Sequence, residues 1–455
     1  MKPLFTVIGG GLAGTEAAWQ IARAGGRVCL YEMRPKVATA AHKTDRLGEL
    51  VCSNSLKSDL AGSAPYLLKE ELRRLDSLLI RVADEVKVPA GHALAVDRDR
   101  FAQRLTDEIA REPRIELVRE EVRALPEDGI TIVATGPLTS GSLSASVAKF
   151  TGAENLYFYD AISPIVDATT LDESRLFRAS RYGKGGEDYL NAPLNEEEYL
   201  RFYQALIGAE SVPLHECEKA MYFEGCLPLE ELARRGVDTL RFGPMKPVGL
   251  MDPQTGRRAY AIVQLRLENL MADSYNLVGF QNHLKFPEQK RVFRLIPGLE
   301  KAEFLRFGQI HRNTFIQSPR LLEPTLQAKM RPDLFFAGQI CGVEGYVESI
   351  ATGLLAAINA CRLAEGREPL VPPAATACGS LLRYIALADP GGFQPANISF
   401  GLLPPASEEL KRRVRDRKER HRVQVEQALQ AMDCWIDLLS EREDAGGQGF
   451  KEIVS

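Results

Sequence analysis

The chain has 455 residues, of which 45% are hydrophobic and 26% charged, and its formal net charge is −4. This composition is typical of a globular protein with more than one core, and it excludes a molecule that binds nucleic acid through overall positive charge. No apolar run approaches about 18 residues, so no membrane-spanning helix is expected, and the first residues lack a secretory pattern. Because the eight cysteines are scattered, without CxxC pairs or a zinc-type cluster, we expect a reduced, cytoplasmic protein without a metal.

The first 32 residues predict the start of a doubly wound nucleotide-binding fold. Buried strands are expected over 4–8 and 27–32, with a helix over 13–24 between them. The turn after the first strand reads G-x-G-x-x-G. Its first glycine permits a tight turn, the second lets backbone approach a pyrophosphate, and the third lets helix and strand pack closely. Glu32 ends the second strand at the spacing where an acid accepts ribose hydrogen bonds. The residues expected at the dinucleotide are Gly9, Gly10, Gly11, Leu12, Ala13, Gly14 and Glu32.

The rest of the chain predicts a discontinuous fold. Helices are expected over 65–83, 95–111, 347–364 and 407–439, and strands over 115–118, 130–134 and 333–340. The middle is richer in glycine and proline punctuation and is interpreted as an insertion. We therefore predict an α/β nucleotide-binding fold in two parts (1–165 and 325–375), an inserted α+β substrate domain (166–324) and a C-terminal helical extension (376–455).

The segment DLFFAGQI, residues 333–340, resembles the second flavin-contacting segment of glutathione-reductase-like proteins. It is followed by glycines and a helix, so a second helix N-terminus would face the cofactor. The resemblance implies a glutathione-reductase-like Rossmann fold that binds FAD rather than NAD. The residues expected at the flavin here are Gly338, Gly342, Gly345 and Tyr346.

Longer stretches resemble the folate- and FAD-dependent tRNA (uracil-5-)-methyltransferases, which are related to the GidA-type wobble-uridine modification flavoproteins. The stretches are VIGGGLAGTEAAWQIA, LVCSNSLKSD, YGKGGEDYLNAP, YFEGCLPLEELARRG, FGPMKPVGL, GFQNHLKFPEQKRVFRLIPGLE, HRNTFIQSP and AGQICGVEGYVESIATGL. The resemblance implies methylation of uracil C5 in the T-loop of tRNA. Methylenetetrahydrofolate would supply the carbon, FAD the electrons, and NADPH or NADH would reduce the flavin.

Two cysteines are candidates for the thiolate that such chemistry needs. Cys226 precedes Leu-Pro-Leu-Glu-Glu-Leu, where Pro228 resembles the first residue of a helix, and a helix N-terminus favours an ionised thiol. The family resemblance assigns Cys226 the attack on C6. It assigns Cys52, near Lys57, removal of the C5 proton or protection of a flavin intermediate. The two roles are exchangeable, and on spacing alone a cysteine is more often a small buried hydrophobe than a catalytic thiol.

Several alternatives remain open at this level. The same chemistry could act on a ribosomal RNA uridine, or the chain could be a wobble-uridine modification flavoprotein, a small-molecule flavin oxidoreductase or a flavin-binding RNA chaperone. The basic stretch 411–422 could contact RNA phosphates, or it could be a solvated helix with acid–base pairs from Glu408 and Glu409. Asn282, His283 and Lys285 are candidates for holding folate. The sequence does not determine the oligomeric state.

Overall fold

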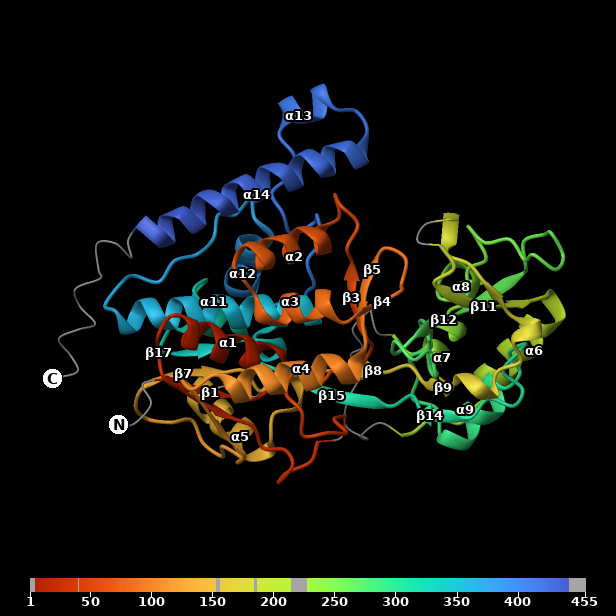
Figure 1. Ribbon diagram of the computed structural model, residues 1–455, viewed down its shortest axis with the longest axis horizontal. Helices are drawn as coiled ribbons and strands as arrows, with labels where there is room; N and C mark the ends of the chain where they lie inside the picture. The colour runs from red at the N-terminus through yellow and green to blue at the C-terminus, as the bar shows by residue number, and fades with distance from the viewer. Residues whose placement is uncertain (1–4, 40, 153–155, 184–185, 214–226, 442–455) are drawn as a thin grey trace.

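The computed structural model describes residues 5–39, 41–152, 156–183, 186–213 and 227–441, and it consists of two bodies side by side and a C-terminal helical segment (Figure 1). The first body contains the N-terminal and late segments of the chain, and the second contains the middle. Each body has its own hydrophobic core.

The first body is built on a six-stranded sheet that is parallel except for its edge strand β16. In sheet order the strands are β16 (Gln327–Ala328), β17 (Arg331–Phe336), β7 (Ile130–Val133), β1 (Phe5–Ile8), β2 (Val28–Tyr31) and β6 (Ile115–Val118). The central strands are short and apolar, as expected where helices cover both faces of a parallel sheet. The predicted closure of the sheet by a late strand is confirmed, because β17 pairs with β7 and sets Phe335 opposite Ile132.

Two helices that are far apart in the sequence pack against each other in this body. They are α1 (Leu12–Arg23) and α11 (Tyr346–Ala364). A Cβ on Gly353 of α11 would lie 2.2 Å from the carbonyl oxygen of Ala13, so the close approach requires glycine. Within the described residues α11 is the one helix long and apolar enough to cross a membrane, yet 83% of that stretch is buried in the core.

The other helices of the first body are α2 (Ala64–Arg74), α3 (Leu78–Glu85), α4 (Arg98–Arg111), α5 (Gly141–Thr151), α10 (Ser318–Leu321) and α12 (Ala377–Leu387). A small antiparallel sheet stands beside them, with the order β3 (Ser55–Ser58), β5 (Ala93–Val96), β4 (Lys87–Val88). This sheet lies at the side of the first body that faces the second (Figure 1).

The second body has a six-stranded sheet whose paired strands are all antiparallel. In sheet order the strands are β10 (Phe177–Arg178), β11 (Tyr189–Leu194), β12 (Ala261–Leu267), β13 (Ser274–Leu277), β9 (Ile165–Asp167) and β14 (Phe304–Arg306). Its helices are α6 (Glu196–Ile207), α7 (Leu229–Arg234), α8 (Thr239–Phe242) and α9 (Phe286–Phe293). A two-stranded ribbon, β8 (Leu156–Ala161) with β15 (Ile310–Phe315), connects the bodies.

The core of the second body runs from Val166 to Ala302 in sequence. Ile316 and Leu322, which the sequence analysis assigned to the insertion, lie in the first core instead. The division of the chain into domains otherwise stays a prediction. Short 3₁₀ turns lie at Gly136–Leu138, Ala168–Thr170, Glu173–Arg175, Arg181–Gly183 and Gln339–Cys341.

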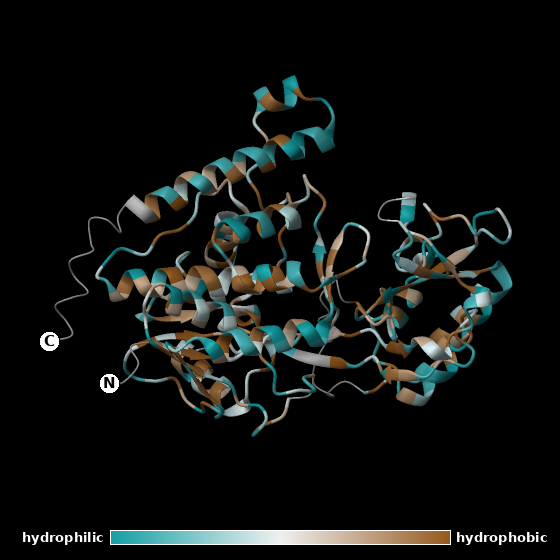
Figure 2. Cartoon of the chain, viewed as in Figure 1, coloured by the Kyte–Doolittle hydropathy of each residue, from teal (hydrophilic) through white to brown (hydrophobic). Residues whose placement is uncertain are grey.

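The C-terminal segment forms α13 (Glu408–Arg413) and α14 (Arg417–Glu441). Figure 2 shows hydrophilic and hydrophobic bands along α14. Its buried residues recur every three or four positions and pack into the first core; they are Val425, Ala428, Met432 and Trp435. Instead of the single predicted helix over 407–439, the chain breaks at 414–416.

Two other predicted helices also differ from the structure. The helix predicted over 65–83 is two helices, because Asp76 has a left-handed φ of 55° and the Ser77 hydroxyl accepts a hydrogen bond from Ile80 N, capping α3. The helix predicted over 95–111 begins only at Arg98. Its first two residues belong to β5, and the Asp97 carboxylate caps α4 by accepting a hydrogen bond from Arg100 N.

Candidate active site

A pocket of about 370 Å³ opens where the central strands of the first sheet end. Its lining includes Ile8 at the end of β1, Tyr31 at the end of β2 and Ala134 after β7. This is the position at which open α/β sheets bind their ligands. Gln281 of the second body also lines the pocket, so both bodies contribute to its wall.

The glycine-rich turn forms one wall of the pocket. Gly9 has φ 108°, and a Cβ there would lie 2.5 Å from the carbonyl oxygen of Ala134. A Cβ on Gly14 would lie 1.8 Å from the oxygen of Gly9, so this glycine allows α1 to pack on the strand. A Cβ on Gly11, by contrast, would meet nothing within 4 Å. The open space at Gly11 and the N-terminus of α1, which has no side-chain cap, fit a dinucleotide pyrophosphate.

The Glu32 carboxylate joins this turn to the next strand. Its two oxygens accept hydrogen bonds from Gly10 N at 3.0 Å and from three nitrogens of Arg34, at 2.9, 2.9 and 3.0 Å. Burial alone would raise the pKa of Glu32, but the hydrogen bonds and charge of Arg34 outweigh it and lower that pKa. Glu32 is therefore ionised. Since four donors already occupy its oxygens, a ribose hydroxyl would share an acceptor with them.

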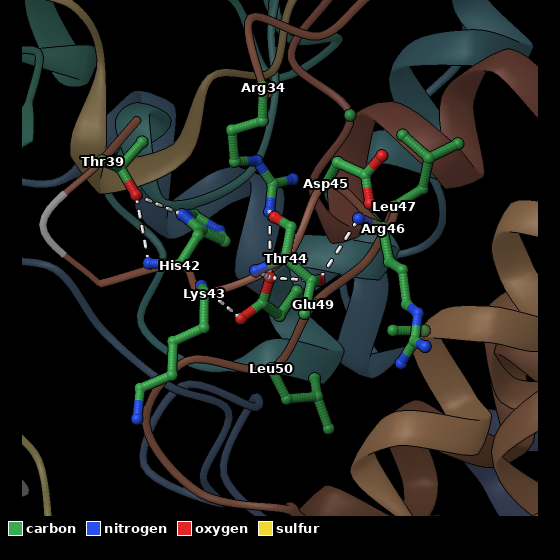
Figure 3. A network of polar contacts seen from close by, with 12 residues as sticks. Arg34, Thr39, His42, Lys43, Thr44, Asp45, Arg46, Leu47, Glu49 and Leu50 are labelled. Carbon is green, nitrogen blue, oxygen red and sulfur yellow. Dashed lines mark hydrogen bonds and ion pairs between the residues drawn. The ribbon is translucent and has the colours of Figure 1, made fainter. Parts of the chain in front are cut away.

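The loop between β2 and β3 folds over the same pocket and is held by a second carboxylate. The Glu49 side chain points back toward Arg34, whose Nη1 lies 3.1 Å from Glu49 Oε2 (Figure 3). The backbone nitrogens of Lys43 and Thr44 donate to the same carboxylate at 2.8 and 3.0 Å. In the same loop His42 Nδ1 lies 2.7 Å from the hydroxyl of Thr39.

Several residues of this loop between 33 and 49 line the pocket although no sequence pattern predicted them there. Four of the lining residues in this range carry polar side chains: Arg34, Thr39, His42 and Glu49. Residues 33–49 have no hydrophobic period and none of the motifs described above, so the only available signal was their unusual share of charged and hydroxyl side chains.

The predicted second segment lies across the pocket. Gly338 and Gly345 line it, and α11 begins directly after Gly345, which has φ 119°. Gly342 is not part of the lining. A Cβ there would lie 2.3 Å from the ring of Phe393, so this glycine serves packing. Of the other predicted cofactor residues, Gly9, Gly11, Leu12, Ala13, Glu32 and Tyr346 line the pocket, whereas Gly10 and Gly14 lie behind it.

Cys52 is half-buried and lines the same pocket. The Tyr346 hydroxyl accepts hydrogen bonds from Cys52 N at 2.8 Å and from Ser53 N at 3.1 Å. Burial, and next the charge of Cys52, raise the pKa of Tyr346 well above its usual range. The phenol therefore stays neutral beside the thiol. Cys226, the other predicted thiol, lies outside the described residues.

Lys57 and Glu348 form an ion pair at the pocket, with Nζ 3.0 Å from Oε1. Glu348 is fully buried, and it also accepts a hydrogen bond from Ile398 N. The Lys57 ammonium is thus paired with this carboxylate. Cys341 is a buried thiol that donates to Gly338 O, and burial raises its pKa to about 12.

The predicted folate residues do not line this pocket. The Asn282 side chain is buried and bonds to the backbone of its own turn, at Phe280 O and Leu284 N. His283 is buried against Glu230, with Nδ1 2.6 Å from Oε1. Lys285 pairs with an exposed acid, Glu210.

Comparison with known proteins shows the family of the chain. The family described as "Glucose inhibited division protein A" matches residues 5–368. The protein named methylenetetrahydrofolate--tRNA-(uracil-5-)-methyltransferase TrmFO in Koribacter versatilis (strain Ellin345) is 62% identical, over 94% of this chain and 97% of its own length. The protein of the same name in Solibacter usitatus (strain Ellin6076) is 60% identical, over 95% and 98%.

A solved structure of Aquifex aeolicus GidA, in its form I crystal, has the same fold. It superposes with a TM-score of 0.67 at 17% sequence identity, covering 95% of this chain and 76% of that one. The predicted α/β fold is thereby confirmed. Together with the high identity to the named relatives, these comparisons establish that the chain belongs to the TrmFO family of methylenetetrahydrofolate--tRNA-(uracil-5-)-methyltransferases, within the wider GidA family.

Proposed function

We propose that this protein binds FAD and methylates C5 of a uridine in the T-loop of tRNA in the cytoplasm, with methylenetetrahydrofolate as carbon donor and NADPH or NADH as reductant. The observation that carries the proposal is the pocket itself. One cavity brings together the glycine-rich turn, the N-termini of two helices and the half-buried thiol of Cys52. The names of relatives at about 60% identity supply the carbon donor and the base.

The residues that would hold the flavin come from both glycine-rich segments. Gly9, Gly11 and the first turn of α1 would take the pyrophosphate, because free backbone N–H groups face the open space there. Gly345 and Tyr346 would approach the ring from the start of α11. When bound, FAD supplies the two electrons that bring a carbon at the formaldehyde level to a methyl group.

Two thiols would act on the base. Uracil C5 is a poor nucleophile until a thiolate adds to C6, which makes C5 enolate-like. We assign that addition to Cys226. After C5 bonds to the methylene carbon, tetrahydrofolate would leave from that carbon, and Cys52 would accept the proton that C5 loses or would shield the reactive centre. Addition of a hydride to the resulting exocyclic methylene, with the two electrons that reduced flavin supplies when bound, and departure of the C6 thiolate would then give the methyl group and restore the C5–C6 double bond.

RNA would reach this pocket through local contacts, since the net charge is −4. The basic stretch 411–422 spans α13 and the start of α14, and part of its charge is paired internally: Lys411 with Glu408 and Arg422 with Glu419. A uridine in a folded loop would have to leave its stack, because C5 and C6 must meet two reagents at once.

The decisive experiment incubates the purified protein with unmodified tRNA, NADPH and methylenetetrahydrofolate labelled in its methylene carbon. We expect label at uracil C5, located to the T-loop by mass spectrometry of the digested RNA. Cys226→Ala and Cys52→Ala should each abolish transfer, whereas Cys434→Ala, at an exposed position on α14, should not. Label in ribosomal RNA or at the wobble uridine would redirect the proposal. A requirement for S-adenosylmethionine, or flavin turnover without an RNA product, would refute it.

A further inference from the structure

The backbone just before Cys52 is held by two arginines, one from each body. Arg98 Nη1 donates to the carbonyl of Leu50, and Arg306 Nη2 donates to the carbonyl of Val51, both at 2.5 Å. Arg98 begins α4 in the first body and Arg306 ends β14 in the second. Arg306 and Val51 are 255 positions apart in the sequence. Two consecutive carbonyls that lead into the thiol are thus fixed from opposite sides.

The same segment is held on its other side by the Tyr346 hydroxyl, which accepts from Cys52 N and Ser53 N. Four backbone groups of residues 50–53 therefore have partners that lie far away in the sequence. A loop segment held in this way has little freedom to move, because each displacement breaks a hydrogen bond to a buried or partly buried group. The position of the Cys52 sulfur is consequently set by both bodies.

The charges of this cluster are unbalanced. The Arg98 side chain is 14% exposed and pairs with the buried Glu268 at 2.9 Å. Arg306 is 9% exposed and has no carboxylate within ion-pair distance in the described part of the chain. Burial, and then the like charge of Arg98, lower the pKa of Arg306, while Tyr346 and Cys52 act in the opposite direction. Burial also lowers the pKa of Arg98, but Glu268, followed by Tyr346 and Cys52, raises it overall.

A buried cation without a counter-ion is costly, and a nearby anion reduces that cost. Two ionisable groups, Tyr346 and then Cys52, act to raise the pKa of both guanidinium groups. Because burial keeps Tyr346 neutral, the remaining group of the two that could carry negative charge near both arginines is the Cys52 thiol. Thiols next to arginine or lysine ionise and react more readily than free ones.

We propose that Arg98 and Arg306 are positioning residues for Cys52: they fix the carbonyls ahead of it and place two guanidinium charges next to the segment that carries its sulfur, so that the reactivity of the sulfur depends on both arginines. The second body thereby contributes to the reactivity of a thiol that the first body carries. This inference relies on the proposed function for the task of Cys52, but it concerns the sulfur itself and can be measured without RNA or folate.

The test measures alkylation of Cys52 by iodoacetamide in the full-length protein at pH 7.5. Peptide mapping by mass spectrometry gives the rate at Cys52 relative to the exposed Cys434 in the same molecule. Arg306→Gln keeps an N–H donor for the Val51 carbonyl but removes the charge. We expect this change to lower the alkylation rate of Cys52, relative to that of Cys434, on the order of tenfold. Arg306→Lys restores the charge and should recover most of the rate.

Arg294→Gln is the matched control. Arg294 is also an arginine of the second body, and it donates to the carbonyl of Ala302 at 3.1 and 2.9 Å. Its loss should leave the Cys52 to Cys434 ratio unchanged. An unchanged ratio in a folded Arg306→Gln protein, or equal slowing by Gln and Lys, would overturn the inference.

A second variant covers the case in which Arg306→Gln does not fold. The double change Arg98→Gln with Glu268→Gln removes the other guanidinium together with its partner, so neither member of that ion pair is left buried without the other. It should also slow alkylation of Cys52, and an unchanged ratio contradicts the inference. If alkylation of Cys52 is slower in these variants but the wild-type protein transfers no methyl group to tRNA, the proposed function is wrong and this inference stands. If the wild-type protein transfers the methyl group but neither change alters the alkylation rate of Cys52, this inference is wrong and the proposed function stands.

Discussion

At the scale of single residues, the glycines of one motif have different tasks. Gly14 faces backbone, with Gly9 O 1.8 Å from the place of its missing Cβ, whereas Gly11 faces the open pocket. The motif letters are the same in both cases. The neighbouring atoms in the folded structure distinguish a glycine that lets a helix pack closely from a glycine that leaves room for a ligand.

This difference gives a matched pair of variants. Gly14→Ala should destabilise the fold by about 1–3 kcal/mol, because its methyl group meets backbone that cannot move aside. Gly11→Ala should change stability by less than about 1 kcal/mol. Its methyl group would, however, occupy the open space expected to hold the pyrophosphate, and this should reduce the amount of flavin retained per chain. Thermal denaturation and the absorbance of bound flavin measure the two effects. Equal destabilisation by both changes, or full flavin content in Gly11→Ala, would contradict this assignment.

At the scale of elements, helix α2 carries two buried ionisable side chains in one turn. Lys69 is fully buried and donates to the carbonyls of Leu56, Ser58 and Pro65. Burial lowers the pKa of Lys69 to about 8. Glu71 accepts from the first N–H groups of α12, and burial raises the pKa of Glu71 to about 7. The helix thus ties β3 and α12 to the first core through polar groups rather than through its apolar face alone.

The shift of Lys69 predicts the stability of the protein at alkaline pH. Between about pH 8 and 10.5 the unfolded lysine still binds a proton that the folded one has lost, so this residue makes the free energy of unfolding rise with pH. The contribution is at most roughly 1.4 kcal/mol per pH unit. Urea denaturation at several pH values should show this increase of the free energy of unfolding with pH in the wild type and in Lys149→Met, an exposed control. The increase due to Lys69 should be absent in Lys69→Met. If the free energy of unfolding of Lys69→Met depends on pH just as that of the wild type does, the prediction is contradicted.

At the scale of the whole molecule, the two bodies meet at the segment around Cys52. The buried Asn54 amide donates to Val96 O in the first body at 3.0 Å and to Leu267 O in the second at 2.8 Å. Its oxygen accepts from Arg266 Nε at 2.9 Å. One side chain therefore satisfies polar groups of both bodies.

Asn54→Ala should loosen this contact without unfolding either core. It leaves two carbonyls and a guanidinium without their partner, at a cost of roughly 1–3 kcal/mol. Hydrogen exchange measured by mass spectrometry should become faster over 50–54 and 265–268. Asn191→Ala, a buried amide that bonds only within the second body, should accelerate exchange there and leave 50–54 as it was. Faster exchange throughout both bodies in Asn54→Ala would show that the residue stabilises the fold in general.

Local features and the family could be predicted from the amino-acid sequence. The strand, glycine turn and helix at the N-terminus, the late strand β17 and the start of α11 follow from short-range patterns, because hydrophobic period and backbone freedom are properties of neighbouring residues. The long matching stretches indicated the family, and with it Cys52. Three contacts became visible in the folded molecule alone: Gly342 packs against Phe393, Lys57 pairs with Glu348, and Arg98 and Arg306 bind the carbonyls just before Cys52. Such contacts join single residues across hundreds of positions, and a charged side chain has no periodic signal to say which distant carbonyl or carboxylate it will meet.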